Sequence, residues 1–599
     1  MKNKLAGWKA KLLSLAGRAV LIQASSSTIP AYVMQCSLLP NRVLEGIDRV
    51  NRNFLWGSLD SVRKVHWVGW GKVTQPKSEG GLGLQSARGR NKALLTKLNW
   101  RFQTEEESLW ARVIKAKYCS NRRINSRNSS ILPRSQIWRG MNKGTDLFQQ
   151  GVRWVIGKDS NLSFWYDAWS KKGSLRQQVY GPLPLGVSEW KVKDIATPGG
   201  WRWDLIPFEL PTSIKLEIQA IPYALASSSR DKLLWANSPR GDFSLSSAYR
   251  MANGLSQNLA FGGNWIWKLQ TLPKIQFFLW KCAHNSIGVN GCLSARGMEV
   301  DSRCPRCLKE TKTIIHALRN CELVKPVWDE LGAMGIDREF FVSNLDNWMA
   351  TNGKYDKASN ENHPPWNIIF SFAVWAIWKS RNQFVFSNHS QNPHMAKDIM
   401  SKSVEFFFCA YSKKGKPHTV IKQVHWRKPE KGWMKLNTDG SSLGNSGLAG
   451  GGGVIRDWTG RWIVGFSRKI GIATSLMAEL WAIRDGLMLC VDRNLVMVEI
   501  ELDAKSVVDM LRNSNYTNNS LSPIIEDCRK LISMIPQIRI KHCYREANGS
   551  ADYLARKGTD QEQSFIVMDN PPEDMTAIVE FDLFGVGVAR RCLELFLVS

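Results

Sequence analysis

The chain has 599 residues, 43% of them apolar, which is enough for three or more domains with sizeable cores. No apolar run is long enough to span a membrane, and the Met1 start lacks the apolar core of a signal peptide. We therefore expect an intracellular protein, nuclear or cytoplasmic, with its 12 cysteines in a reducing setting. A formal charge of +29 and 27 Trp favour nucleic acid as the partner, against the blander interpretation that the charge only aids solubility.

The basic residues are distributed unevenly along the chain. Residues 1–430 carry a net charge of +31, residues 431–560 a net +3, and residues 561–599 a net −5. The first 430 residues are therefore expected to supply most of the affinity for a polyanion. The sequence predicts no oligomeric state.

Two connecting segments come first in chain order. Residues 1–150 predict a basic connector that begins with amphipathic helices. Residues 151–260 predict a β-rich connector, because short strand-like pieces alternate with turns. The aromatic cluster from Phe164 to Trp169 is interpreted as core packing, since its spacing does not support a platform for stacked bases.

Residues 261–345 contain the one group of cysteines with informative spacing. Cys304 and Cys307 are separated by two residues, His316 follows after eight more, and Cys321 after a further four. Three thiolates and one imidazole can complete a tetrahedral Zn²⁺ site, and four protein ligands leave no open position for water. The alternative is that these cysteines are free thiols. We predict a structural Zn²⁺ site in a mostly helical segment.

The last 250 residues begin with a helical connector and linker over 346–430. Strands are then predicted at Met434 to Asp439, Val454 to Asp457, Arg461 to Ser467, Val496 to Leu502 and Gln537 to Tyr544. Helices are predicted between and after the later strands. This order predicts an α/β domain over 431–560, with a five-stranded mixed sheet flanked by helices. Residues 561–599 form a tail to which the sequence assigns no function.

Four acids lie at positions where this fold would present them together. Asp439 ends the first strand, Glu479 lies on an apolar helix, Asp503 follows the fourth strand, and Asp552 lies early in the last helix. Clustered carboxylates repel one another unless cations neutralise them. Oxygen-only ligands suit Mg²⁺ or Mn²⁺. The pattern therefore indicates a metal-dependent nuclease site.

The same segments resemble the ribonuclease H domain of plant non-LTR (LINE-type) retroelement reverse transcriptases. The matching pieces are Asn437-Thr438-Asp439-Gly440-Ser441, Ala478-Glu479-Leu480-Trp481-Ala482, Glu501-Leu502-Asp503-Ala504 and His542 to Ala555. The cysteine segment resembles the zinc-binding part of those proteins, and residues 1–150 resemble the stretch after their polymerase. No Tyr-x-Asp-Asp or Phe-x-Asp-Asp occurs, so the polymerase itself is missing.

The resemblance implies endonucleolytic cleavage of RNA within RNA–DNA hybrids by two divalent ions. Asp439, Glu479, Asp503 and Asp552 would hold the ions, and His542 would move protons or help product leave. The plainer interpretation of His542 is a surface histidine at a strand end.

Nucleic-acid contacts are expected from Gly440, Ser441 and Asn548, since glycine permits close approach of the backbone. The alternative function, of a different class, is a catalytically silent nucleic-acid-binding remnant of a retroelement polyprotein.

Overall fold

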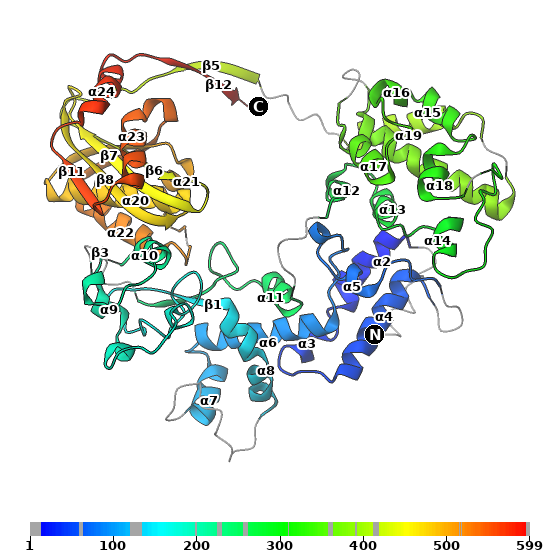
Figure 1. Cartoon of the computed structure of the whole chain (residues 1–599), viewed down its shortest axis with the longest axis horizontal. Helices are drawn as coiled ribbons and strands as arrows, with labels where there is room; N and C mark the ends of the chain where they lie inside the picture. The colour runs from blue at the N-terminus through cyan, green and yellow to red at the C-terminus, as the bar shows by residue number, and fades with distance from the viewer. Residues whose placement is uncertain are drawn as a thin grey trace. The chain divides into compact units, whose positions relative to one another are not determined.

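The structure is a computed structural model that describes residues 13–594, apart from 59–63, 120–134, 198–199, 225–229, 255–260, 310, 358–362, 390–391, 411–417, 514 and 517. The chain divides into two compact units (Figure 1). The helical unit comprises Met1–Asn99, Glu107–Leu147 and Ala248–Lys414. The sheet unit comprises Trp100–Glu106, Phe148–Ser247 and Gly415–Ser599.

Helices build the helical unit and bury many of its aromatic residues. Its first half contains α2 (Leu15–Leu21), α3 (Ala31–Met34), α4 (Asn41–Trp56), α5 (Trp70–Val73), α7 (Leu109–Tyr118) and most of α6 (Ala87–Thr104) and α8 (Gln136–Gly151), whose last residues belong to the sheet unit. Its second half contains α12 (Trp265–Lys268), α13 (Pro273–Ala283), α14 (Asn290–Ser294), α15 (Lys325–Glu330), α16 (Ala333–Ile336), α17 (Leu345–Lys354), α18 (Trp366–Ser387) and α19 (Met395–Ala410).

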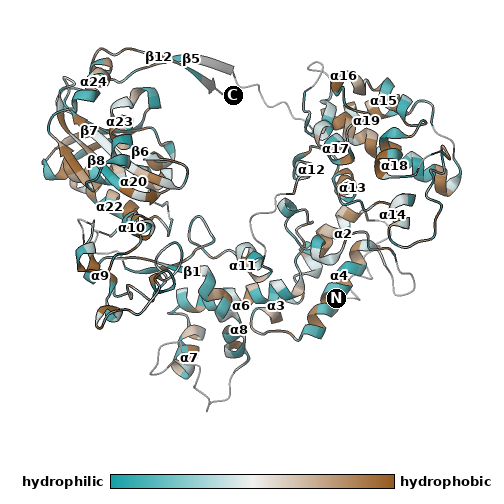
Figure 2. Ribbon diagram, viewed as in Figure 1, coloured by the Kyte–Doolittle hydropathy of each residue, from teal (hydrophilic) through white to brown (hydrophobic). Residues whose placement is uncertain are grey.

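The core of that second half is centred on α18, which buries 12 of its 22 residues and carries both hydrophobic and hydrophilic residues (Figure 2). Trp328, Trp348 and Phe370 meet there with their ring centroids 5.1 to 5.9 Å apart. Neither α18, with 22 residues, nor any other described helix has the length and hydropathy to cross a membrane.

A six-stranded mixed sheet forms the centre of the sheet unit. Its order is β10-β9-β6-β7-β8-β11, with β6, β9 and β10 parallel and β6, β7, β8 and β11 antiparallel. The strands are β6 (Met434–Ser442), β7 (Gly447–Arg456), β8 (Trp462–Ala473), β9 (Met497–Leu502), β10 (Gln537–His542) and β11 (Phe565–Met568). The five expected strands are therefore present, and the tail adds a sixth beside β8.

Glycines in β7 let helices pack tightly on both faces of this sheet. A Cβ on Gly452 would lie 2.3 Å from the backbone nitrogen of Ala555 in α23 (Gly549–Asp560). A Cβ on the neighbouring residue, Gly451, would lie 3.3 Å from the Cβ of Ala482 in α20 (Ser475–Asp492). Because successive strand residues point to opposite faces, α20 and α23 cover opposite sides of the sheet. The helices α21 (Lys505–Arg512) and α22 (Ser522–Met534) complete the sequence-predicted set.

The tail also continues into regular structure beyond β11. It forms α24 (Thr576–Leu583) and then β12 (Val588–Glu594), which pairs antiparallel with β5 (His418–Val424) at the start of the domain. Residues of α24 form a small core with α23 and β7. The folded nuclease-like domain thus extends past the expected end at residue 560.

Residues 148–247 have their own small core. Short strands β1 (Val152–Val155), β2 (Ala196–Thr197), β3 (Gly200–Trp201) and β4 (Lys232–Trp235) accompany α9 (Val192–Ile195) and α10 (Thr212–Gln219), and α11 (Leu245–Ala252) leads on into the helical unit. Trp165 and Trp169 are fully buried in that core. Their burial agrees with the expectation of core packing.

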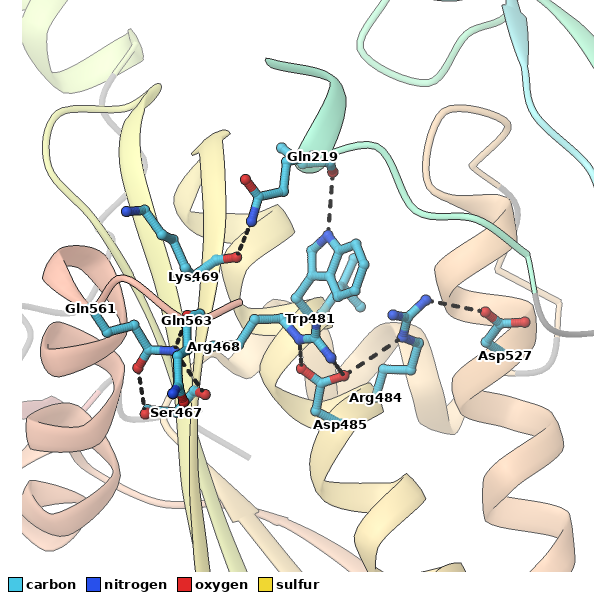
Figure 3. A network of polar contacts seen from close by, with 12 residues as sticks. Gln219, Ser467, Arg468, Lys469, Trp481, Arg484, Asp485, Asp527, Gln561 and Gln563 are labelled. Atoms are coloured by element: carbon cyan, nitrogen blue, oxygen red, sulfur yellow. Dashed lines mark hydrogen bonds and ion pairs between the residues drawn. The ribbon is translucent and has the colours of Figure 1, made fainter. Parts of the chain in front are cut away.

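The α10 end of this connector packs on α20 and β8 of the sheet domain (Figure 3). The Trp481 indole donates to the carbonyl of Ala220 at 3.3 Å, and the Gln219 amide donates to the carbonyl of Lys469 at 3.0 Å. The Arg484 guanidinium lies 3.9 Å from the centre of the Trp481 ring. The connector and the sheet domain, expected as separate segments, therefore share one compact unit.

Candidate active site and metal centres

Two of the predicted acids come together because their strands are parallel neighbours. In the pairing of β6 with β9, Thr438 lies opposite Leu502. Asp439 follows Thr438 and Asp503 follows Leu502, so both acids lie at the same edge of the sheet. The carboxyl ends of parallel strands meet at one edge, so the two carboxylates converge without a special loop.

Glu479 reaches the same point from the first turns of α20. The side chain of Thr474 caps this helix by accepting from the backbone N–H of Met477. A Cβ on Gly440 would lie 2.2 Å from the backbone nitrogen of Glu479, so only glycine lets the helix approach β6 this closely. Gly440 therefore positions Glu479 next to Asp439.

The carboxylates of Asp439, Glu479 and Asp503 form one cluster. One oxygen from each lies within 4.8 Å of the others. Burial raises the pKa of Asp439 to about 8, and the charges of Asp503 and Asp552 add to that effect. Burial and the charge of Asp439 also raise the pKa of Glu479 well above its usual value. The Oε2 atom of Glu479 is buried without a hydrogen-bond partner. An oxygen-only donor set with mutual repulsion, two of its three members buried, fits a hard divalent cation.

Asp552 lies beside this cluster rather than within it. Its carboxylate is held by Arg545 at 2.8 Å and by Arg556 at 2.9 Å. It is nevertheless close enough for its charge to raise the pKa of Asp439. Arg545 has the opposite effect, since its charge lowers the pKa of Asp439 and of Glu479. Arg545, at the start of a 3-10 turn, is a site residue that the sequence analysis missed, because a single basic residue carries no distinguishing spacing.

His542, Gly440 and Ser441 lie around the cluster. The His542 ring is exposed, and its Nε2 lies 3.0 Å from the backbone carbonyl oxygen of Asp503. Gly440 and Ser441 continue β6 directly after Asp439 and are partly exposed. The expected roles of these three residues, proton transfer and backbone contact with nucleic acid, stay predictions.

Asn548 is buried, and its side chain is engaged inside the domain. Its amide donates to the carbonyl of Thr438 at 2.9 Å and accepts from the amide of Asn437 at 3.2 Å. These bonds tie the start of α23, which carries Asp552, to the residues just before Asp439. The geometry gives Asn548 a positioning role, while its expected contact with nucleic acid stays untested.

A buried ion pair from the tail extends this connection. Asp582 of α24 accepts from the Arg456 guanidinium at 2.9 Å and from the Ser550 hydroxyl at 2.7 Å. Arg456 in turn donates to Asn437 at 3.1 Å, two residues before Asp439. The side chains of Arg456 and Asp582 are 1% and 4% exposed, so this pair is almost fully removed from water. The tail is thereby connected to both β6 and α23, two elements of the acidic cluster.

The four predicted zinc ligands also converge, in the helical unit. Cys304, Cys307, His316 and Cys321 each offer a ligand atom within 4.8 Å of the others. His316 begins a short π-helical segment, His316–Asn320, and Cys321 ends it. Three sulfur atoms and one nitrogen form a donor set that fits tetrahedral Zn²⁺.

Cationic side chains surround this cluster. The ammonium of Lys312 is buried without a hydrogen-bond partner. Burial lowers the pKa of Lys312 to about 8, with a further contribution from Arg381, while Cys304 and Cys321 oppose the shift. Three thiolates with one Zn²⁺ keep a net negative charge, and the cations offset it. The donor set therefore has the electrostatic surroundings that a three-thiolate metal site needs.

Two family models match the segments that contain the two clusters. The family described as "Reverse transcriptase-like" matches residues 437–558, and the family described as "zinc-binding in reverse transcriptase" matches residues 243–328. Among solved structures, an RNase H1 from Halobacterium salinarum is 29% identical over 21% of this chain and 98% of its own, with a TM-score of 0.21. LC11-RNase H1 in complex with an RNA/DNA hybrid is 26% identical over 21% and 96%, with a TM-score of 0.20.

Curated relatives cover more of the chain. An Arabidopsis thaliana protein named "Putative ribonuclease H protein" is 32% identical over 99% of this chain and 96% of its own length. An "Uncharacterized mitochondrial protein" of the same plant is 28% identical over 24% of this chain and 92% of its own. With a relative of this identity along its whole length, the chain belongs to the family of plant retroelement-derived ribonuclease H proteins.

Proposed function

We propose that the protein is a divalent-metal-dependent endonuclease that hydrolyses the RNA strand of RNA–DNA hybrids. The observation that carries the proposal is the cluster of the buried Asp439 and Glu479 with the partly buried Asp503, with ligand oxygens within 4.8 Å of one another. Repulsion among carboxylates in such a cluster destabilises the fold, and bound cations neutralise that repulsion. Membership in a ribonuclease H family supports the same reaction class.

Asp439, Glu479 and Asp503 would hold Mg²⁺ or Mn²⁺, with Asp552 completing the set. Bound divalent ions in such sites activate water and stabilise the leaving oxygen of a phosphodiester. The protein's part is to hold the carboxylates at one edge of the sheet. Asp552, held by Arg545 and Arg556, would have to leave at least one of these partners to reach an ion. His542, whose Nε2 lies 3.0 Å from the carbonyl oxygen of Asp503, would move protons or help the product leave.

The helical unit would be stabilised by Zn²⁺ held by Cys304, Cys307, His316 and Cys321. Four protein ligands leave this ion without an open position, so its role is structural. The nucleic-acid partner would be held largely by the basic residues of the first 430 positions, where the formal charge is +31.

The test is cleavage of an end-labelled RNA–DNA hybrid by the purified full chain with Mg²⁺. The expected result is internal cutting of the RNA strand only, with loss of activity on chelation and no cutting of a DNA duplex. The variant Asp439→Asn should bind the hybrid but not cleave it, since the swap removes a metal ligand and keeps the shape. A well-folded full chain that binds the hybrid without cutting it would overturn the proposal and indicate a silent nucleic-acid-binding protein. Cleavage retained by Asp439→Asn would place the activity at another site.

A further inference from the structure

A second feature with the chemistry of a binding site lies in the helical unit, in the part built by α13, α18 and α19. A cavity of about 610 Å³ opens between these helices. Three lysines line it, one from each helix: Lys274, Lys379 and Lys402. All three side chains are exposed, and none forms an ion pair or a hydrogen bond within the described residues.

The lysines are close enough to repel one another. The pKa of Lys379 is lowered by burial first, and then by the charges of Lys402 and Lys274. The cavity also contains two acids, Asp398 and Glu405, but neither forms an ion pair with a lysine of the cavity. Asp398 instead accepts from the Asn392 amide at 2.7 Å. The three lysines outnumber the two acids and pair with neither, so the cavity keeps a positive charge that an external anion can neutralise.

The floor of the same cavity is aromatic. Phe372, Trp375 and Phe406 line it, and the Phe372 and Phe406 rings lie 5.4 Å apart. Trp375 and Phe406 are only partly buried. The side chain of Gln383 also lines the cavity and offers both a donor and an acceptor. Partly exposed rings beside cations are the combination that binds unpaired nucleotides, with the base on the ring and the phosphate on the cation.

We propose that this cavity is a binding site for single-stranded nucleic acid, in which Lys274, Lys379 and Lys402 hold successive phosphates and a base enters over Phe406 and Trp375. Base-paired strands keep their bases stacked, so the site selects an unpaired segment. The proposal rests only on the nucleic-acid partner of the proposed function and not on cleavage. In the hybrid, it would hold a single-stranded extension while the sheet unit acts on the duplex.

The test is fluorescence anisotropy of a labelled single-stranded oligouridylate with the full chain over a salt series. Each neutralised phosphate of a single strand contributes a slope of about −0.7 to log K against log salt. Replacing all three lysines by Gln should therefore flatten the slope by roughly 2. Between about 50 and 200 mM salt, the unaltered chain should lose roughly twentyfold more affinity than this variant. The lysines are exposed, and an unchanged zinc content and circular dichroism spectrum would show that the variant is folded.

Two matched variants identify the source of the effect. Changing Lys325, Lys354 and Lys397 to Gln removes the same charge from exposed positions of the same unit that do not line the cavity. The control variant should lose less than half as much of the salt slope as the cavity Gln variant loses. A variant with Arg at all three cavity positions should keep the full slope of the unaltered chain. Equal losses from both Gln variants, or an unchanged slope for the cavity variant, would overturn the proposal.

The aromatic floor has its own readout. Phe406→Leu should lower affinity by about fivefold or more without changing the salt slope, because stacking of a base is not an ionic contact. An unchanged affinity would overturn the placement of a base in the cavity.

Polyglutamate should compete weakly at equal charge. Competition as strong as that of unlabelled oligouridylate, lost in the cavity variant, would show a site for acidic protein segments and overturn the assignment to nucleic acid. Failure of hybrid cleavage with retained oligouridylate binding would leave this site standing and count only against the nuclease.

Discussion

At the scale of single residues, the carboxylates of the acidic cluster repel one another, and only bound cations or protons remove that repulsion. The pKa of Asp439 is about 8 in the folded domain, against an ordinary value of 3.8. A carboxyl group with a raised folded-state pKa favours folding most below its ordinary pKa. That contribution is lost as pH rises toward 8. The metal-free domain should therefore become less stable between about pH 4 and pH 8.

The variant Asp439→Asn should remove much of this pH dependence. In chelator at pH 8, we expect its free energy of unfolding to exceed that of the unaltered chain by roughly 2–5 kcal/mol, because a neutral amide replaces a buried, repelled carboxylate. Thermal unfolding of both proteins across pH 5 to 8.5 measures the effect. Added Mg²⁺ should stabilise the unaltered chain more than the variant. A variant less stable than the unaltered chain in chelator at pH 8 would contradict the electrostatic account.

The cysteine cluster makes a separate prediction. Replacing Cys304 and Cys307 by Ser removes two of the four converging ligands, so the zinc content should fall from about one ion per chain toward zero. Elemental analysis of the purified proteins measures this. The control is Cys292→Ser, a partly buried cysteine of the same unit outside the cluster, which should keep its zinc. Equal zinc content in all three proteins would exclude the site.

At the scale of elements, the tail is part of the domain rather than an appendage. Asp582 accepts from Arg456 and Ser550 inside the domain, and α24 packs on α23. Removing one partner of a buried ion pair leaves a buried charge uncompensated. The last described helix therefore contributes to the stability of β6 and α23, which carry Asp439 and Asp552.

We predict that Asp582→Ala lowers the free energy of unfolding by about 3 kcal/mol or more, because Arg456 would be left charged and buried. Chemical denaturation of the full chain measures the change. Glu580→Gln, on the exposed side of the same helix, should change it by less than about 0.5 kcal/mol. If the two variants are equally stable, the tail does not support the domain.

The sequence predicted those features whose evidence is local. The acids follow strand ends or lie early in helices, and the resemblance to a ribonuclease H domain adds their expected roles, whereas the zinc ligands lie within one short segment with informative spacing. The tail and connector contacts have no such signal. Arg456 and Asp582 are 126 residues apart, and Trp481 and Ala220 are 261 apart. A buried pair between distant residues leaves each partner looking like an ordinary polar or aromatic side chain. Asn548 was assigned to nucleic acid for the same reason, since its internal partners are 110 and 111 residues away.

At the scale of the whole molecule, charge and chemistry are divided between segments. The net charge of +31 lies in residues 1–430, whereas the acidic cluster lies beyond them. Binding and cutting are thus expected to depend on different parts of the chain.

We predict that the full chain binds an RNA–DNA hybrid more tightly at low salt, and with a steeper salt slope, than residues 415–599 alone. This fragment keeps the tail that a fragment ending at 560 would lose. Anisotropy of a labelled hybrid over a salt series compares the two, with circular dichroism showing that the fragment is folded. Equal slopes would mean that the basic residues of the first 430 positions do not contact the hybrid.

The pairing of β5 with β12 determines where the nuclease-like domain joins the rest of the chain. His418 lies opposite Glu594 and Val424 opposite Val588, so the first and last strands run antiparallel along their whole length. The outer ends of these two strands therefore lie side by side (Figure 1). A domain built in this way tolerates transplantation, because a host loop needs to open by only one strand spacing to accept it. Tension on its two ends would break the hydrogen-bonded pairs of β5 and β12 one after another before it reached the carboxylates of the acidic cluster.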